Sequence, residues 1–138
     1  MTDYHKAAAI IIQNKKLLLT REKNKAFFIS PGGVIENGET PEQALVRELD
    51  EEIGVEVNKN DLEFFGTFYA VAAGSENKTL QMDTYLVNKW LGEPHPCEGE
   101  EIIEEIRWLD SKIPENIKIG SIFEHEVIPR LKKMDLID

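Results

Sequence analysis

The sequence predicts one α/β domain in which a mixed β-sheet carries helices on its faces. Segments rich in β-branched and aromatic residues outnumber helical segments, and the two kinds do not alternate regularly along the chain. The chain has 138 residues, of which 41% are apolar, which is enough for one buried core and leaves no room for a second. We therefore expect residues 1–138 to fold as a single domain.

The first part of the chain predicts three short strands and a loop of special shape. Residues 7–12 and 16–20 are apolar runs on either side of the polar residues 13–15, a pattern typical of a β-hairpin. Residues 27–29 form another short apolar strand. It ends at the Ser-Pro-Gly-Gly sequence of residues 30–33, where two glycines allow backbone conformations closed to other residues, so we expect a loop there.

A helix is predicted over residues 40–53 from the signals at its two ends. Thr40 is a suitable N-cap, Pro41 fits the first helical position, and Gln43 can complete a capping box. Gly54 follows the last helical residue, where a glycine commonly ends a helix.

The remaining sequence predicts three strands and a second helix. Residues 62–73 and 79–91 are rich in aromatic and β-branched residues, and the polar turn between them indicates two long antiparallel strands. Residues 105–109 alternate between apolar and polar, as a strand does. Residues 119–134 have the apolar spacing of a helix, which Pro129 is expected to kink.

Charge and composition exclude several classes of partner and location. The 16 basic and 26 acidic residues give a net charge of -10, which repels phosphate backbones, so we expect no stable nucleic-acid binding. No apolar run approaches the roughly 18 residues of a membrane-spanning helix, so no membrane partner is expected. Cys97 is the only cysteine and has no partner for an internal disulfide, which favours a cytoplasmic protein.

Acidic residues concentrate on the first predicted helix, and their arrangement indicates a metal site. Glu48, Glu51 and Glu52 lie at helical spacings where like charges repel by roughly 0.2–0.5 kcal/mol per pair, near a helix end whose dipole also disfavours anions. A locally unfavourable arrangement of charges is found mostly at functional sites. Clustered carboxylates are suitable ligands for hard divalent cations such as Mg²⁺. The alternative is a solvated acidic face of the helix.

The order of residues between Gly33 and Val55 decides in favour of the metal site. The segment resembles the signature box of the Nudix hydrolases, G-x5-E-x7-R-E-U-x-E-E-x-G-U with U a bulky aliphatic residue, and every fixed position matches. The flanks are similar to the family as well, with Pro-Gly-Gly at the start of the box and an acid-rich loop before a Trp-containing strand. The resemblance implies a Nudix-type α/β/α sandwich with a mixed β-sheet between helices.

The resemblance also implies a divalent cation, Mg²⁺ with Mn²⁺ as the alternative, and the residues that hold it. In the family, three box carboxylates bind the cation, often with a backbone carbonyl of the glycine loop. The corresponding metal ligands in this sequence are Gly33, Glu48, Glu51 and Glu52.

Catalytic roles follow from the same resemblance. We place Glu48, Glu51 and Arg47 in the catalytic set, with Glu48 as one candidate for the base that takes the proton of the attacking water. Arg47 resembles the residue that orients the box carboxylates, and Glu39 a carboxylate that pairs within the same unit. A plain ion pair between Arg47 and Glu39 is an equally good interpretation.

The later acidic loop could supply a further ligand or base, as it often does in the family. Among its acids we favour Glu101 or Glu98. The alternative for either residue is a solvated surface charge.

Four residues outside the box are candidates for substrate binding. Arg21 and Lys23 precede the glycine loop and could meet the phosphates of a nucleotide, although a solvated surface role is the alternative. Phe28 and Tyr85 could stack on a base, although aromatic residues in strands usually belong to the core.

The family acts on a nucleoside diphosphate linked to another moiety, so the resemblance implies a small-molecule nucleotide substrate. Our leading hypothesis is hydrolysis of a (deoxy)nucleoside triphosphate to the monophosphate and pyrophosphate. The alternatives are an ADP-ribose or nucleotide-sugar pyrophosphatase and a non-catalytic nucleotide-sensing domain. Val71 stands where ADP-ribose hydrolases of the family carry proline, which disfavours that subfamily. Because family members are often dimers, we also expect that this chain can form a homodimer.

Overall fold

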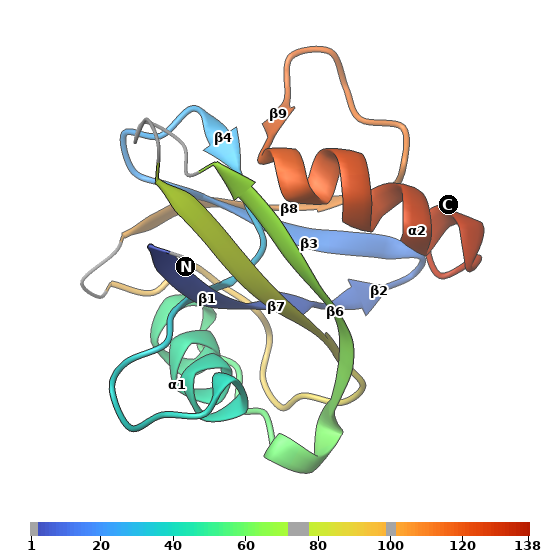
Figure 1. Cartoon of the computed structure of the whole chain (residues 1–138). Coiled ribbons are helices and arrows are strands. Elements are labelled where there is room, and N and C mark those ends of the chain that lie inside the picture. Colours follow the sequence, from blue (N-terminus) through green and yellow to red (C-terminus); the bar gives the residue numbers. More distant parts are fainter. Residues whose placement is uncertain (1–2, 72–77, 99–101) are drawn as a thin grey trace.

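The strands form two main sheets, of which the larger contains the first strand of the chain. The computed structural model describes residues 3–71, 78–98 and 102–138. The strand order of the larger sheet is β5 (Gly32–Val34), β1 (Tyr4–Ile10), β7 (Thr79–Val87) and β6 (Leu62–Val71). β1 and β7 are parallel, whereas the two outer pairs are antiparallel, so this sheet is mixed, as predicted (Figure 1).

A second, antiparallel sheet and a short parallel pair complete the strands. The second sheet has the order β2 (Ile12–Gln13), β3 (Lys16–Glu22) and β8 (Ile103–Leu109). The parallel pair consists of β4 (Phe27–Phe28) and β9 (Lys118–Ile119).

The predicted hairpin is confirmed, but the strand before its turn is divided between the two sheets. Asn14 and Lys15 have φ values of 53° and 61°, as a two-residue hairpin turn requires, and Ile12 pairs with Leu17. β1 instead pairs along its whole length with β7, far away in the sequence. A continuous apolar run is the pattern of a strand buried on both faces, and it does not say which strand lies beside it.

Each face of β1 contributes to a different hydrophobic core. Ala8 belongs to the core that also contains the C-terminal helix, whereas its neighbour Ala9 belongs to the core beneath α1 (Pro41–Ile53). Figure 1 shows α1 and α2 (Ile128–Lys133) on opposite sides of the strands. The predicted α/β/α sandwich is therefore confirmed, with its strands divided into two sheets rather than one.

The ends of α1 are as predicted from the sequence. The Thr40 hydroxyl accepts a hydrogen bond from the backbone N–H of Gln43 at 3.1 Å, and the Gln43 side chain accepts one from the backbone N–H of Thr40 at 2.9 Å. Gly54 ends the helix in the left-handed region, with φ of 66°. Leu45 and Leu49 are fully buried beneath the helix, which fixes its acidic side relative to the sheet.

The glycine loop contains a short strand that the sequence did not predict. Gly32 and Gly33 pair with Ala8 and Ala7 of β1. Gly32 has φ of +143°, and a Cβ atom there would lie 2.1 Å from the carbonyl oxygen of Ala7. Glycine is therefore needed here because the backbone of the loop lies so close to β1, as well as for a turn.

One of the two long strands predicted after α1 ends earlier than predicted. β7 ends at Val87 rather than at residue 91, whereas β6 is described as far as Val71. Residues 72 and 73 of the predicted strand lie outside the described residues. Leu91 pairs with Glu56 in an isolated bridge, and a 3₁₀ turn, η1 (Lys59–Asp61), precedes β6.

The C-terminal segment contains a π-helix that was not predicted. The predicted start of the helix at residue 119 is wrong, because Ile119 ends strand β9. The π-helix η2 (Phe123–Val127) leads into α2, whose second residue is Pro129. Proline lacks the N–H that an α-helical turn needs at this position, so a wider turn before Pro129 accommodates it. No helix within the described ranges is long and apolar enough to cross a membrane.

Candidate active site

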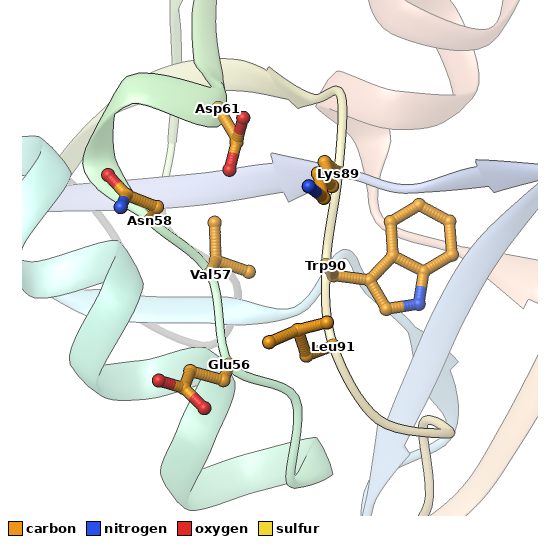
Figure 2. A pocket seen from close by; sticks show the side chains of 7 residues that line it. All are labelled: Glu56, Val57, Asn58, Asp61, Lys89, Trp90 and Leu91. Atoms are coloured by element: carbon orange, nitrogen blue, oxygen red, sulfur yellow. The ribbon is translucent and has the colours of Figure 1, made fainter.

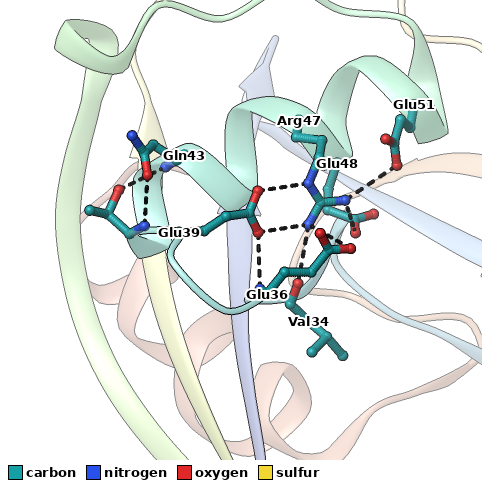
Figure 3. Close-up of polar contacts among 8 residues, drawn as sticks. Val34, Glu36, Glu39, Gln43, Arg47, Glu48 and Glu51 are labelled. Atoms are coloured by element: carbon teal, nitrogen blue, oxygen red, sulfur yellow. Dashed lines mark hydrogen bonds and ion pairs between the residues drawn. The ribbon is translucent and has the colours of Figure 1, made fainter.

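Arg47 of α1 lies at the centre of a cluster of carboxylates beside the glycine loop (Figure 3). Its Nε and Nη2 donate to the two carboxylate oxygens of Glu39 at 2.8 and 3.0 Å, as a bidentate fork. Its Nη1 donates to Glu48 at 2.9 Å and to Glu51 at 3.4 Å. Nη2 also donates to the backbone carbonyl of Val34 at 3.3 Å. One guanidinium group thus joins the helix to the preceding loop and gathers three acids around it.

Opposite charges within this cluster stabilise each other. The bonds from Arg47, together with a 3.0 Å bond from the backbone N–H of Glu36, lower the pKa of Glu39 to about 2. The bond with Glu39 is also the main reason why the pKa of Arg47 is raised further above its ordinary value. Both groups therefore stay charged at neutral pH, and their attraction offsets the repulsion among the neighbouring acids.

Gly33 leaves room for the carboxylate of Glu48. A Cβ atom added to Gly33 would lie 2.5 Å from Cδ of Glu48 and 2.6 Å from its Oε1. The carboxylate therefore rests directly against the backbone of β5. Of the residues predicted as metal ligands, the structure brings Gly33 and Glu48 into direct contact.

The three acids of the helix occupy different environments. The side chain of Glu51 is 55% exposed, whereas that of Glu48 is 16% exposed. Glu52 is 5% exposed as a whole residue. A carboxylate is rarely buried so deeply without a compensating role, so the burial of Glu52 distinguishes it from an ordinary solvated acid on a helix face.

The later acidic loop is attached to the C-terminal end of α1. The backbone N–H of Cys97 donates to the carbonyl of Glu52 at 2.9 Å, and that of His95 donates to the next carbonyl of the helix at 3.0 Å. These bonds satisfy carbonyl groups that a helix end leaves without intrahelical partners. The exposed residue Glu98 comes directly after this attachment. Glu101, the other predicted loop acid, lies outside the described residues.

The donor atoms of the cluster fit a hard divalent cation. Carboxylate and carbonyl oxygens are the ligands that such cations prefer, and the helix and the glycine loop supply both kinds. Among the described residues, no three acidic, histidine or cysteine side chains already converge on one point. Arg47 holds one oxygen of Glu48 and one of Glu51, so a cation would share their remaining acceptor sites or replace Arg47 there.

Comparison with known protein families identifies the family to which this fold belongs. The family model described as NUDIX domain matches residues 3–131, which include all of α1 and the glycine loop. The chain belongs to the NUDIX domain family. As a Nudix hydrolase it is an enzyme, and enzymes of this family generally depend on a divalent metal.

Individual relatives agree with this assignment. The chain is 43% identical over 101 residues to an 8-oxo-dGTP diphosphatase of Haemophilus influenzae, which covers 68% of this chain and 70% of the relative. It is 36% identical over 92 residues to the Escherichia coli enzyme of the same name, covering 64% and 67%. A solved MutT structure, from work on Aliivibrio salmonicida and Vibrio cholerae, superposes with a TM-score of 0.69 at 29% identity, covering 95% and 97%.

Two of the predicted substrate-binding residues of this Nudix domain, Arg21 and Phe28, lie together. Arg21 of β3 bonds to Glu104 at 3.3 Å and to Glu105 at 3.4 Å, and its guanidinium carbon lies 6.0 Å from the centre of the Phe28 ring. Phe28 is only 3% exposed and belongs to the core on the α2 side. Lys23, the third candidate, is exposed.

Tyr85 is held in the core beneath α1. It is 8% exposed, and its hydroxyl donates to Glu42 at 3.2 Å near the start of the helix. Burial is the main cause that raises the pKa of Tyr85, followed by the negative charge of Glu42. Its ring meets that of Phe64 edge-on at 5.5 Å. Tyr85 and Phe28 thus belong to different cores, so the two predicted base-stacking residues do not face each other.

Sequence reasoning missed two polar features that long-range pairing creates. A cavity of about 320 Å³ lies between the segment after α1 and the segment after β7, and Figure 2 shows Asp61, Lys89 and Trp90 around it. None of the predicted site residues lines this cavity. In the larger sheet, Asp83 lies 2.6 Å from Nε2 of His5, which is 78 residues away. No local pattern could have predicted either feature, because their residues meet only in the folded chain.

Proposed function

We propose that this Nudix hydrolase converts nucleoside triphosphates, oxidised deoxynucleotides such as 8-oxo-dGTP among them, into the monophosphate and pyrophosphate. The observation that carries the proposal is the arrangement of Glu39, Glu48 and Glu51 around Arg47, beside Gly33. Relatives named 8-oxo-dGTP diphosphatase, at 43% and 36% identity, support this substrate class.

In this proposal, Mg²⁺ binds to oxygen atoms of Glu48, Glu51 and Glu52 and to the backbone carbonyl of Gly33, and Mn²⁺ can replace it. When bound, such a cation lowers the pKa of a water molecule and neutralises charge on the phosphate oxygens. The need for a cation also follows from charge, since a polyphosphate and a chain of net charge -10 otherwise repel each other.

Arg47 is proposed as a positioning residue in this site. Its bonds fix the side chains of Glu48 and Glu51 on the helix, and its fork to Glu39 fixes the helix against the loop. Such preorganisation matters because small displacements of reacting groups cost large factors in rate. Arg47 supplies no proton, because the raised pKa keeps its guanidinium charged.

A carboxylate must accept the proton of the attacking water, and two of the described residues are proposed for this step. Glu48 lies in the cluster itself, only 16% exposed at its side chain. Glu98 follows Cys97, whose bond to the carbonyl of Glu52 attaches the later loop to the helix end that carries the acids. This attachment favours Glu98 among the described acids of the loop, since Glu104 bonds to Arg21 instead. Glu101 stays a candidate from the sequence alone.

Substrate contacts are proposed mainly for Lys23. Its exposed amine can approach a phosphate, whereas the guanidinium of Arg21 is already paired with two carboxylates. The burial of Phe28 and Tyr85 makes them walls of the two cores rather than open stacking surfaces. A pool of nucleoside triphosphates as substrate, together with the single cysteine, favours a cytoplasmic enzyme.

A hydrolysis panel with Mg²⁺ tests the proposal. Nucleoside triphosphates, 8-oxo-dGTP, ADP-ribose and nucleotide sugars are incubated with the chain, and the products are separated by chromatography. We expect a monophosphate and pyrophosphate from one or more triphosphates. Turnover of ADP-ribose or a nucleotide sugar alone would assign the chain to that alternative, and no turnover despite Mg²⁺ binding would indicate a nucleotide-sensing domain.

A pair of matched variants tests the metal ligands in the same assay. Glu52→Gln removes one charge from the buried acid of α1, and we expect kcat to fall by at least about 10–100-fold, the loss typical of groups that support a metal site, with the fold retained. Glu126→Gln removes the same charge from an exposed position on η2 and should leave kcat unchanged. Equal activity of both variants would contradict the assignment of Glu52.

A further inference from the structure

His95 and Cys97 form a pair of side chains at the C-terminal end of α1. Nε2 of His95 lies 3.5 Å from Sγ of Cys97. The backbone N–H groups of both residues donate to the last turn of the helix, that of His95 to the carbonyl of Ile53 at 3.0 Å and that of Cys97 to the carbonyl of Glu52 at 2.9 Å. The loop that carries the pair is therefore fixed to the helix, and the two side chains are held beside each other.

The ring of His95 is oriented so that Nε2 carries a lone pair. Its other nitrogen, Nδ1, lies 2.9 Å from the backbone carbonyl oxygen of Glu93. Because a carbonyl oxygen can only accept a hydrogen bond, Nδ1 is the donor, and Nε2 of the neutral imidazole is the acceptor that faces Cys97. Metal-binding histidines usually donate their other ring N–H to a carboxylate or a backbone carbonyl in this way. His95 thus has the orientation of a metal ligand.

The distance between the two side chains fits two ligands of one tetrahedral zinc ion. Zinc lies about 2.3 Å from a cysteine sulfur and about 2.0–2.1 Å from a histidine nitrogen, so tetrahedral geometry places these two ligand atoms about 3.6 Å apart. The observed separation of 3.5 Å agrees with this value. A cation could therefore bind between Nε2 and Sγ without a rearrangement of the loop.

The surroundings of the pair favour a cation. The last turn of α1, which the structure describes completely, has no basic residue, and residues 50–52 are all acidic. The negative end of the helix dipole lies at the same place. Gly54 also leaves room for the pair, because an added Cβ there would lie 2.4 Å from Cε1 of His95 and 3.2 Å from Sγ of Cys97. Both side chains therefore lie directly against a helix end that attracts positive charge.

We propose that Nε2 of His95 and Sγ of Cys97 bind a divalent transition-metal ion such as Zn²⁺ at the C-terminal end of α1. Cys97 forms no disulfide, so its thiol is available, and the thiol proton passes to solvent when the thiolate binds the ion. Among the described residues, no third acidic, histidine or cysteine side chain converges on the pair. Water therefore completes the coordination, and the ion is bound less tightly than in a structural site with four protein ligands.

The proposed site differs from the magnesium site in its donor atoms. Thiolate and imidazole are ligands that zinc prefers, whereas the carboxylates bonded to Arg47 suit a hard cation. Nε2 and Sγ are not among the atoms proposed to hold Mg²⁺. Either proposal can therefore fail without the other.

Titration of the reduced chain with Co²⁺ in the presence of excess Mg²⁺ tests the proposal. Mg²⁺ competes for the carboxylate oxygens, which it prefers, and leaves the thiolate and the imidazole to Co²⁺. A thiolate bound to Co²⁺ gives a charge-transfer band in the near ultraviolet, whereas carboxylate ligands give none. We expect the wild-type chain to develop this band with a single equivalent of Co²⁺. Zn²⁺ should then remove the band, because it occupies the same tetrahedral site.

Three variants identify the ligands in the same titration. Cys97→Ser should abolish the band. His95→Gln should weaken Co²⁺ binding by at least about tenfold, since even the outer partners of metal ligands contribute about 10–100-fold in affinity. His125→Gln, the control, removes an imidazole from an exposed position on η2 and should bind Co²⁺ like the wild type. None of the three side chains is buried, so each variant should retain the circular dichroism spectrum of the wild type.

Several results would overturn the proposal. A wild-type chain that gives no band at saturating Co²⁺ would show that His95 and Cys97 form only a hydrogen bond. A band that Zn²⁺ does not remove would exclude zinc as the ion. Unchanged affinity in His95→Gln would show that the imidazole is not a ligand, and an equal loss of affinity in His125→Gln would place the histidine ligand elsewhere.

Discussion

Two arginines of this Nudix domain bind carboxylates, but they find them at very different separations along the chain. The carboxylates that accept hydrogen bonds from Arg47 all lie within eight residues of it, and the shortest of these bonds are 2.8–3.0 Å. Arg21 bonds to Glu104 and Glu105, 83 and 84 residues away, at 3.3 and 3.4 Å. The first cluster is built by one helix and the loop before it, whereas the second forms only when β3 and β8 pair.

The comparison shows how local structure can fix a functional cluster. Helical spacing places Glu51 one turn from Arg47, and the capping box at Thr40 sets the direction from which Glu39 enters. The Arg21 contacts depend instead on the register of two distant strands. We therefore expect changes in the Arg47 cluster to alter activity, and changes around Arg21 to alter stability by a small amount.

The largest effect in this comparison is expected for Gly33→Ala. The new Cβ would lie 2.5 Å from Cδ of Glu48, so the carboxylate must move. Because the Glu48 side chain is flexible, this movement should lower the free energy of unfolding only slightly. A displacement of about 1 Å can cost on the order of 10² in rate. Steady-state kinetics should therefore show a loss of roughly that size in kcat, with a melting temperature close to that of the wild type.

The control for this variant is Gly120→Ala. Its added Cβ meets Ile29 at 3.4 Å, an ordinary contact on the opposite side of the molecule from α1. Its kcat should match that of the wild type. A Gly33→Ala enzyme of normal activity would show that the position of the Glu48 carboxylate does not matter for turnover.

A smaller effect is expected on the pH dependence of stability. The pKa of Glu39 is lowered from 4.5 to about 2 in the folded chain. Its contribution to the free energy of unfolding is therefore fully present above pH 4.5 and is lost as the pH falls towards about 2. Denaturant unfolding of the wild type and Glu39→Gln should therefore differ most near neutral pH. The difference should shrink through this acidic window. A difference that stays constant down to pH 2 would rule out the ion pair with Arg47 as its source.

The smallest effect is expected for Arg21→Gln. Exposed ion pairs contribute at most about 1 kcal/mol, and the carboxylates that bond to Arg21 are themselves partly exposed. Denaturant unfolding should show a loss of stability within that limit, and kcat should be nearly unchanged. A large loss of kcat would instead place Arg21 in direct contact with the substrate phosphates.

The same distinction between local and long-range structure explains what could be predicted from the sequence. The caps of α1 at Thr40 and Gly54 were predicted correctly, because these signals lie within a few residues of the helix. The contact between Gly33 and Glu48 was not predicted, although the loop and the helix that form it are neighbours in the sequence.

Features that depend on distant pairing could not be predicted in this way. The apolar run at residues 7–12 gave no sign that β1 would pair with β7, nor that Phe28 and Tyr85 would enter separate cores. The pair of His5 and Asp83 depends on that same strand pairing. Residue type determines that such side chains are buried, but only the topology determines which of them meet.

The role of Arg47 in organising the active site is tested by measuring kcat for triphosphate hydrolysis in Arg47→Lys and Arg21→Lys. Lysine keeps the positive charge but cannot form the bidentate hydrogen bonds of arginine. The substitution therefore distinguishes the positioning of the carboxylates from their attraction to a positive charge. We expect Arg47→Lys to lose at least about tenfold in kcat because its carboxylates are displaced, and Arg21→Lys to keep a kcat close to that of the wild type. Equal kcat values in the two variants would contradict the claim that Arg47 organises the active site.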